Sequence, residues 1–273
     1  MRIEPVDATL GAVVSDVNLA ALTGTEWEDV HAAFLRYGVL VFPGQHLDAA
    51  AQGWFAARFG ALEQMSPRGE TPTFPIANIK PDGTLATPED EQYRILKGNE
   101  GWHTDSTYMP LASKVAMLSA VVLPPSGGET EFADMRAAWD ALEPKRQQEL
   151  EGMSAYHSLF YSQSRQGFTH RVDHLYGFHD KGAPLRPVVK VHPETGRKSI
   201  YTGRHAHGLL GMSAEDSERY LDELLEWACQ PPRVYRHVWS VGDLVVWDNR
   251  CLMHRACPYD ERHPRHLRGS RVS

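Results

Sequence analysis

Apolar positions near the N-terminus switch between the spacing of a helix and that of a strand. Over residues 25–37 apolar side chains recur every three or four positions, which predicts an amphipathic helix. Residues 39–42 form a short apolar run that is rich in valine and ended by Pro43 and Gly44, so they predict a buried strand. A second helix is predicted over residues 48–58.

Runs with strand character dominate the second half of the chain. Residues 114–123 are strongly apolar and are closed by prolines and glycines, as expected of a strand. Residues 188–191 and 199–202 flank a His-Pro-Glu-Thr-Gly segment, which predicts a hairpin. Residues 234–239 and 244–247, separated by a Val-Gly-Asp turn, predict another hairpin.

Helices are expected around this strand-rich region. Asp134 and Ser213 can each cap a helix N-terminus, and Pro144 suits the first turn of another helix. Residues 64–97 differ, because they are rich in proline, glycine, threonine and charge and hold one strand candidate, residues 76–79. Long irregular segments in compact domains are often functional, so we expect residues 64–97 to form a substrate lid.

Length and composition predict a single domain over residues 1–273. The apolar content of 42% is enough for a sizeable core, and all-β domains of this length are common. The formal net charge of −7 argues against nucleic-acid binding, which usually needs a basic surface. No apolar run reaches the length of a membrane span, so no membrane partner is expected.

Cysteine usage and the N-terminal residues point to one compartment. The three cysteines, Cys229, Cys251 and Cys257, are an odd number without CxxC spacing, which is typical of reduced thiols. The N-terminus carries Glu4 and Asp7, where a signal peptide would need an unbroken apolar stretch. We therefore expect a cytoplasmic protein.

The candidate chemistry centres on His103, Asp105 and His254. His103 and Asp105 are two positions apart, so on a strand their side chains would leave the same face. Two imidazoles and one carboxylate form the facial set that suits Fe(II) and leaves positions open for a co-substrate and dioxygen. His254 lies near the end of the chain, so only a folded barrel or sandwich could join it to the other two. Arg265 follows it and could grip a dicarboxylate.

Other histidine pairs compete with this set, because the chain has 14 histidines. His205 and His207 share the two-residue spacing, and His170 and His174 share the i, i+4 spacing of a helix. Neither pair has a nearby carboxylate and a late arginine in support. We interpret His205 and His207 as loop histidines that are solvated or hydrogen-bonded, and the other pair as part of a polar segment. Spacing alone leaves the alternatives open.

Three segments of the chain, together with Arg265, carry a family resemblance. They are residues 99–105 (NEGWHTD), 127–130 (GGET) and 239–254 (WSVGDLVVWDNRCLMH). This combination resembles the taurine dioxygenase and 2,4-D dioxygenase (TauD/TfdA) family of Fe(II)/2-oxoglutarate enzymes. WHTDSTYMP, FADMRAAWDAL, HPETGR, GRHAHG and VVWDNRCLMHRA are most similar to its (S)-phenoxypropionate and aryloxyalkanoate dioxygenases. The resemblance implies a mainly β fold with flanking helices around a double-stranded β-helix, a cupin-like jelly roll.

The resemblance also implies a role for each matching residue. The implied iron ligands are His103, Asp105 and His254. Thr130 and Arg265 match the positions that hold the distal carboxylate of 2-oxoglutarate, and Trp239 would line the same pocket. Residues expected near the substrate are Asn99, Trp247 and, through its backbone amide, Ser106.

One position departs from the family pattern. The arginine that clamps the anionic group of the substrate in the taurine and 2,4-D enzymes corresponds to Gly269 here. Alternation on a strand would place Arg265, Gly269 and Arg271 on one face and Arg268 on the other. We therefore expect Arg271 to anchor a substrate carboxylate, and the chain resembles the phenoxypropionate-type enzymes at this place.

The implied reaction joins decarboxylation of 2-oxoglutarate to succinate and CO2 with hydroxylation of a small carboxylic acid. If the hydroxylated carbon carries an aryl ether, its collapse gives a phenol and a 2-oxo acid. The carboxylate of Asp105 indicates oxygenation, because related halogenases have a small residue there. Alternatives are a taurine-, alkylsulfonate- or alkylsulfate-type oxygenase and, in a different class, a non-catalytic protein that binds metal or 2-oxoglutarate. The resemblance further implies a homo-oligomer.

Overall fold

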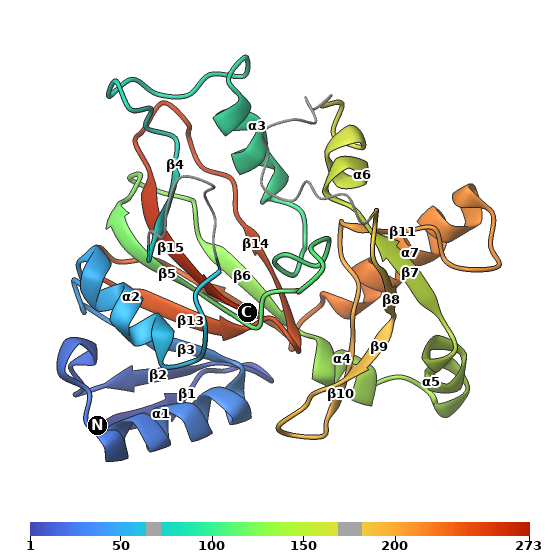
Figure 1. Cartoon of the computed structure of the whole chain (residues 1–273), viewed down its shortest axis with the longest axis horizontal. Helices are drawn as coiled ribbons and strands as arrows, with labels where there is room; N and C mark the ends of the chain where they lie inside the picture. The colour runs from blue at the N-terminus through green and yellow to red at the C-terminus, as the bar shows by residue number, and fades with distance from the viewer. Residues whose placement is uncertain (64–71, 169–181) are drawn as a thin grey trace.

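Two β-sheets form the centre of the fold in the computed structural model, which describes residues 1–63, 72–168 and 182–273 (Figure 1). Within these residues the larger sheet has seven strands, in the order β1 (Arg2–Pro5), β2 (Ala12–Ser15), β3 (Val39–Phe42), β13 (Leu244–Asp248), β5 (Val115–Val122), β15 (His266–Val272) and β4 (Phe74–Ala77). The smaller sheet of the described residues has three strands, in the order β12 (Val234–His237), β6 (Thr130–Asp134) and β14 (Leu252–Ala256). The fold is mainly β with flanking helices, as predicted.

Alternate residues of the central strands are buried on opposite faces of the larger sheet. On β3, Leu40 and Phe42 belong to the core beneath the helices, whereas the other two residues belong to the core between the sheets. Phe132 on β6 contacts Trp247 on β13, with the ring centres 5.4 Å apart, so side chains fill the space between the sheets. Because β3 is covered on both faces, residues 39–42 are apolar at every position.

Two helices, α1 (Gly24–Tyr37) and α2 (Ala49–Ala57), lie along the outer face of the larger sheet (Figure 1). Thr23 and Glu26 form a capping box at the start of α1, and Gly38 ends the helix in the left-handed conformation, with φ of 75°. The helices predicted over residues 25–37 and 48–58 are therefore confirmed. A short 3-10 helix, Leu19–Ala21, precedes α1.

A second group of elements lies on the side of the molecule opposite α1 and α2 (Figure 1). It consists of α4 (Met135–Asp140), α5 (Pro144–Glu151), β7 (Ser154–His157), α6 (Leu159–Ser164), β8 (Leu185–Pro187), β9 (Val189–Val191), β10 (Lys198–Ile200), β11 (Ala206–His207) and α7 (Ala214–Ala228). Strands β9 and β10 pair as the predicted hairpin, and Asp134, Pro144 and Ser213 stand at the predicted helix starts. This group builds its own buried core against β6 and β14.

The hairpin predicted from residues 234–239 and 244–247 is wrong. Strand β12 pairs with β6 in the smaller sheet, whereas β13 pairs with β3 and β5 in the larger one. The connecting turn therefore crosses from one sheet to the other. A local turn signal cannot reveal this, because each strand shows the same apolar pattern whichever partner it has.

The predicted lid lies only partly within the described residues, since residues 64–71 fall outside them. The described remainder includes β4, at the edge of the larger sheet, and helix α3 (Glu91–Gly98), in a stretch whose composition predicts irregular structure. The strand begins two residues before the predicted one. Gln92 on α3 donates to the carbonyls of Ala77 and Ile79, which holds the helix against β4. Over the described ranges, none of the helices combines the length and apolar character needed to cross a membrane.

Candidate active site

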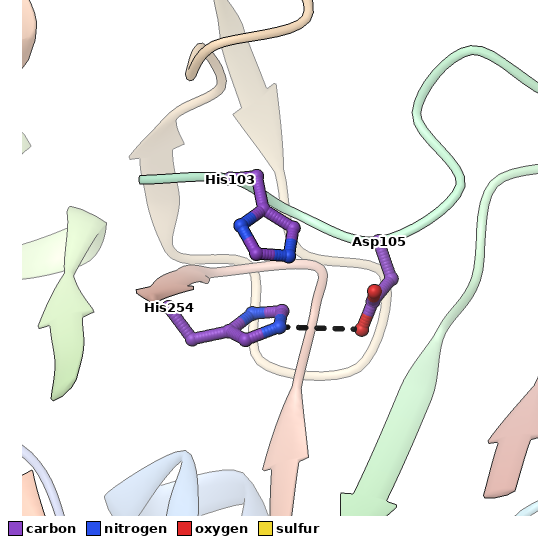
Figure 2. A group of neighbouring side chains, drawn as sticks. All are labelled: His103, Asp105 and His254. Atoms are coloured by element: carbon purple, nitrogen blue, oxygen red, sulfur yellow. Dashed lines mark ion pairs between the residues drawn. The ribbon is translucent and has the colours of Figure 1, made fainter. Parts of the chain in front are cut away.

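A backbone bridge brings His103 and His254 together beside β14. The N–H of His103 donates to the carbonyl of His254 at 3.0 Å, and the N–H of His254 donates to the carbonyl of His103 at 2.8 Å. The ring centres are 4.2 Å apart. Figure 2 shows these two rings and Asp105 pointing toward one another. Strand pairing has thus joined residues from the middle and the end of the chain.

Asp105 enters the site from a turn and not from a regular strand. His103 lies in an isolated bridge, and the turn over residues 105–108 includes Ser106 with a positive φ of 53°. Thr104 points away and donates to the carbonyl of Leu252 at 2.9 Å. Donor atoms of the two histidines and Asp105 lie within 4.8 Å of one another, and all three residues are buried. His103 and Asp105 therefore direct their side chains to the same place, as expected, although neither lies on a regular strand.

Two side chains hold the Asp105 carboxylate. The Asn249 amide donates to its Oδ2 at 3.5 Å and accepts from Nε1 of Trp247 at 3.0 Å. Arg271 forms an ion pair with the other carboxylate oxygen. Burial alone would raise the pKa of Asp105, but its neighbours, the Arg271 guanidinium first among them and the hydrogen bond from Asn249, hold the pKa below its ordinary value. The carboxylate is therefore charged and oriented, as metal-ligating carboxylates usually are.

The two imidazoles are neutral, as metal ligands must be. Burial lowers the pKa of His103 well below its ordinary value, and nearby cationic groups add to the effect. Burial lowers the pKa of His254 to about 4. Nδ1 of His103 donates to the carbonyl of Gly101 at 2.7 Å, which leaves Nε2 as the lone-pair donor. This donor set fits a divalent iron ion.

A second buried cluster of ligand types, His192, Asp248 and Cys251, has a structural role. Nδ1 of His192 accepts from the N–H groups of Glu194 and Thr195 at 3.2 and 3.1 Å. Its Nε2 donates to the Asp248 carboxylate at 2.9 Å. Since both ring nitrogens are used, this imidazole has no lone pair left for a metal ion.

Of the competing histidine pairs, His205 and His207 are described, whereas His170 and His174 lie outside the described residues. Nδ1 of His205 is hydrogen-bonded to a serine hydroxyl at 2.8 Å, and His207 stacks on a tyrosine ring at 4.5 Å between centres. Within the described part of the chain, neither belongs to a cluster of metal-ligating groups.

Thr130, Trp239 and Arg265 lie together at the start of β6. Nε1 of Trp239 donates to Oγ1 of Thr130 at 3.0 Å. Because an indole N–H can only donate, the threonine oxygen accepts, and its own proton stays available for an anion. Thr130 and Arg265 line the cavity described below, whereas Trp239 stands behind Thr130 and is not among the lining residues.

Arg265 is 4% exposed and passes close to Gly128. Its Nη2 donates to the Gly128 carbonyl at 2.9 Å, and its Nε has no hydrogen-bond partner among the described residues. Burial lowers the pKa of Arg265 below its ordinary value. A buried guanidinium with unused donors fits a bidentate carboxylate, such as one end of a dicarboxylic acid.

One cavity joins the metal donors to this arginine. Its lining includes His103, Asp105, His254, Thr130, Arg265, Asn99, Trp247, Arg271, Phe74, Ile76 and Leu118. Ser106 is not among the lining residues, and its hydroxyl donates to Glu63 at 3.1 Å. The mixture of apolar walls with a few convergent charged groups is typical of a small-molecule site.

The local geometry of β15 accounts for Gly269. A Cβ atom at this position would lie 2.6 Å from the ring of Phe74, so glycine lets the ring lie across the strand. Arg271 lines the cavity with its guanidinium 5.3 Å from the centre of the same ring. Arg268 donates instead to the carbonyl of Leu47 at 2.7 Å. The two arginines therefore leave opposite faces of β15, as predicted.

Arg204 is a candidate that sequence reasoning missed. Its Nε and Nη1 are buried with no hydrogen-bond partner among the described residues, and burial lowers its pKa to about 10. Gly98 and Gly101 leave room for it, since a Cβ atom there would lie 2.6 and 3.1 Å from its side chain. Its charge acts on His103 and Asp105. The only sequence signal was the GRHAHG segment, in which nothing local marks the arginine as buried.

Two histidines and one carboxylate in a cavity of a double-stranded β-helix define a non-haem iron oxygenase. Residues 2–271 match the model of the family described as "Taurine catabolism dioxygenase TauD, TfdA family", and the chain belongs to this family. The resemblance stated from its motifs is therefore confirmed.

Known relatives cover nearly the whole chain. It is 51% identical to an (S)-phenoxypropionate/alpha-ketoglutarate-dioxygenase from Sphingobium herbicidovorans, over 99% of this chain and 94% of the relative. It is 39% identical to an alpha-ketoglutarate-dependent 2,4-dichlorophenoxyacetate dioxygenase from Cupriavidus pinatubonensis, over 97% of this chain and 94% of the relative. The solved structure of AAD-2 in complex with Mn(II) and N-oxalylglycine superposes with a TM-score of 0.90 at 36% identity, covering 99% of this chain and 97% of that one.

Replacing Gly128 by alanine is expected to weaken 2-oxoglutarate binding. The added Cβ atom would lie 2.8 Å from Nε of Arg265, so the guanidinium would have to move. Losing one well-placed charge-assisted hydrogen bond should raise the KM for 2-oxoglutarate about tenfold. Steady-state kinetics with 2-oxoglutarate varied would measure this. Gly196→Ala is the matched control, because Gly196 has a similar φ of 69° and nothing within 4 Å of the added atom. An equal change in both variants would show that backbone strain alone is responsible.

Proposed function

We propose that this protein is an Fe(II)- and 2-oxoglutarate-dependent dioxygenase that hydroxylates an aryloxyalkanoate of the phenoxypropionate or 2,4-D type. The shared cavity carries this proposal, because it places the donor set of His103, Asp105 and His254 beside the buried Arg265. Bound iron and 2-oxoglutarate would supply the oxidising chemistry, with dioxygen consumed and succinate and CO2 formed. Hydroxylation at the ether carbon then leads to a phenol and a 2-oxo acid.

The proposed roles follow from the donors that each residue offers. The iron ligands are His103, Asp105 and His254. Thr130 and Arg265 bind the distal carboxylate of 2-oxoglutarate through a hydroxyl proton and a guanidinium, and Trp239 orients the threonine hydroxyl. These contacts leave the opposite end of 2-oxoglutarate directed at the metal donors.

Two arginines are proposed to attract the substrate carboxylate. Arg271 lines the cavity next to Asp105, and Arg204 is buried with unused donors within range of the same carboxylate. A buried cationic group with unused donors needs a counter-charge, so Arg204 favours an anionic substrate, and Arg271 adds a second positive charge at the cavity. Apolar walls of the cavity suit an aryl group, and Asn99 and Trp247, which line it, are further proposed substrate contacts. A contact from the backbone amide of Ser106 stays a prediction from the family resemblance, because Ser106 is not among the lining residues.

The alternative activities are less well supported. A taurine-, alkylsulfonate- or alkylsulfate-type reaction needs the same iron and 2-oxoglutarate site, but the relatives described above are named for aryloxyalkanoate acids. A non-catalytic protein that binds metal or 2-oxoglutarate is less well supported because the relatives described above are named as dioxygenases.

Compartment, domain organisation and assembly remain predictions. All three cysteines are free, which fits the cytoplasm. We further propose that residues 1–273 act as one domain and that residues 64–97 border the substrate as its lid. A homo-oligomer is expected from the family, and light scattering coupled to size-exclusion chromatography would determine the assembly.

Succinate formation in the presence of a substrate panel tests the proposed function. With Fe(II), ascorbate and 2-oxoglutarate supplied, we expect the rate of succinate formation to differ among the compounds of the panel. The panel consists of both enantiomers of phenoxypropionate, phenoxyacetate, taurine and an alkyl sulfate. Phenoxy acids should release succinate and phenol in equal amounts, and a chelator such as EDTA should stop both because the iron is removed. Sulfite or sulfate release without phenol would favour the alternative oxygenases. Metal and 2-oxoglutarate binding without substrate-stimulated succinate for any compound would contradict the proposal.

A further inference from the structure

Asn78 joins strand β4 to the turn that leads into Arg265. Its Oδ1 accepts from the N–H of Arg265 at 2.7 Å, and its own N–H donates to the Arg265 carbonyl at 3.1 Å. Its side-chain NH2 group donates to the carbonyls of His263 at 2.9 Å and Glu261 at 3.2 Å. Asn78 is 2% exposed, so these bonds are shielded from water. One amide thus ties down three backbone positions of the turn.

This bonding pattern determines where the Arg265 side chain begins. Both backbone polar groups of Arg265 are bonded to Asn78, so the direction of its Cα–Cβ bond is set by β4. The guanidinium then runs past Gly128, where an added Cβ atom would lie only 2.8 Å from Nε of Arg265. In so narrow a passage, a small shift of the backbone would misplace the guanidinium. Misplacing a binding group by about 1 Å can cost two orders of magnitude in rate.

Helix α3, whose C-cap residue Asn99 lines the cavity, is attached to the same strand. Gln92 on α3 donates to the carbonyls of Ala77 and Ile79, the residues on either side of Asn78. Lys97, at the end of α3, forms an ion pair with Glu261 in the turn before Arg265. Two independent links, the Asn78 hydrogen bonds and the ion pair between Lys97 and Glu261, therefore join β4 and α3 to the turn before Arg265.

We propose that Asn78 is a positioning residue for 2-oxoglutarate binding, acting through Arg265 and joining that site to the segment formed by β4 and α3. The inference rests on the proposed function, in which Arg265 binds the distal carboxylate. Asn78 itself does not touch the co-substrate.

The test compares Asn78→Asp with the wild type by calorimetric titration of the Mn(II)-loaded protein with N-oxalylglycine, which reports binding without turnover. The aspartate is isosteric but cannot donate to the two carbonyls and places a negative charge beside them. Loss of these buried bonds should raise the Kd for N-oxalylglycine about tenfold. In turnover assays the KM for 2-oxoglutarate should rise by a similar factor, with kcat at saturation changed less than about threefold. Asn18→Asp is the control, because Asn18 caps a distant 3-10 helix through Oδ1 alone.

A double-mutant cycle distinguishes positioning from general destabilisation. If Asn78 acts through Arg265, Asn78→Asp combined with Arg265→Ala should bind N-oxalylglycine no more weakly than Arg265→Ala alone. Additive losses would overturn the proposal, as would unchanged binding in the single variant. Should Asn78→Asp fail to fold, Gln92→Leu takes its place, since it releases β4 beside Asn78 and should raise the Kd at least threefold; an unchanged Kd would count against the inference. Failure of the wild type to bind N-oxalylglycine would overturn the proposed function as well.

Discussion

Replacing His254 by alanine is expected to abolish substrate-dependent succinate formation. The imidazole lies close to both other members of the donor set, with its ring centre 4.2 Å from that of His103 and its Nε2 3.6 Å from Oδ2 of Asp105. Removing partners outside the first layer of ligands costs about 10- to 100-fold in metal affinity or activity, so loss of a ligand itself should cost more than about 100-fold. Anaerobic addition of 2-oxoglutarate to the Fe(II) protein should then give no charge-transfer absorbance.

His207→Ala is the matched control for this experiment. His207 belongs to the competing HxH pair, stacks on a tyrosine ring and has no place in the donor set. Its replacement should leave iron binding within about threefold of the wild type, because His207 is only partly buried and lies outside the donor set. An His254 variant that keeps wild-type iron affinity, or an equal loss in both variants, would contradict the assignment of the ligands.

The second large effect is that Arg265→Ala and Arg271→Ala should each raise the KM for a different compound. Arg265→Ala should raise the KM for 2-oxoglutarate and leave that for the acid nearly unchanged, and Arg271→Ala should do the reverse. Truncating one partner of a buried charge pair costs about 2–5 kcal/mol, which corresponds to roughly 30-fold or more in the affected constant. Both KM values are measured for each variant with the second compound saturating.

The contact between Arg271 and Asp105 calls for one further measurement. Because Arg271 pairs with the carboxylate proposed to bind iron, its removal also changes the charge around that ligand. Iron affinity of Arg271→Ala is therefore determined separately and should fall about 10- to 100-fold, as expected on loss of a group that holds a ligating carboxylate, so both KM values are compared at saturating Fe(II). Equal increases in both KM values for either variant would show that the two arginines do not serve different anions.

Local patterns predicted the elements whose signals lie within a few residues. Helix α1, the fully buried β3 and the strand β5 follow from the spacing of apolar residues alone. The failure at β12 and β13 has a different origin, since partner choice depends on residues more than a hundred positions away. Helix α3 escaped prediction because it is short and mostly polar and lies in a stretch rich in proline and glycine.

Residue types, motifs and the family resemblance selected His103, Asp105, His254, Thr130 and Arg265 from the sequence by itself, together with a mainly β fold. Only the tertiary structure decided that the HxD pair sits in a bridge and a turn, that Arg204 is buried with unused donors, and that Asn78 holds the Arg265 turn. The physical reason is that local sequence encodes which atoms can donate or accept and which faces are apolar. Which of these groups meet, and which lose access to water, depends on how strands far apart in the chain pair.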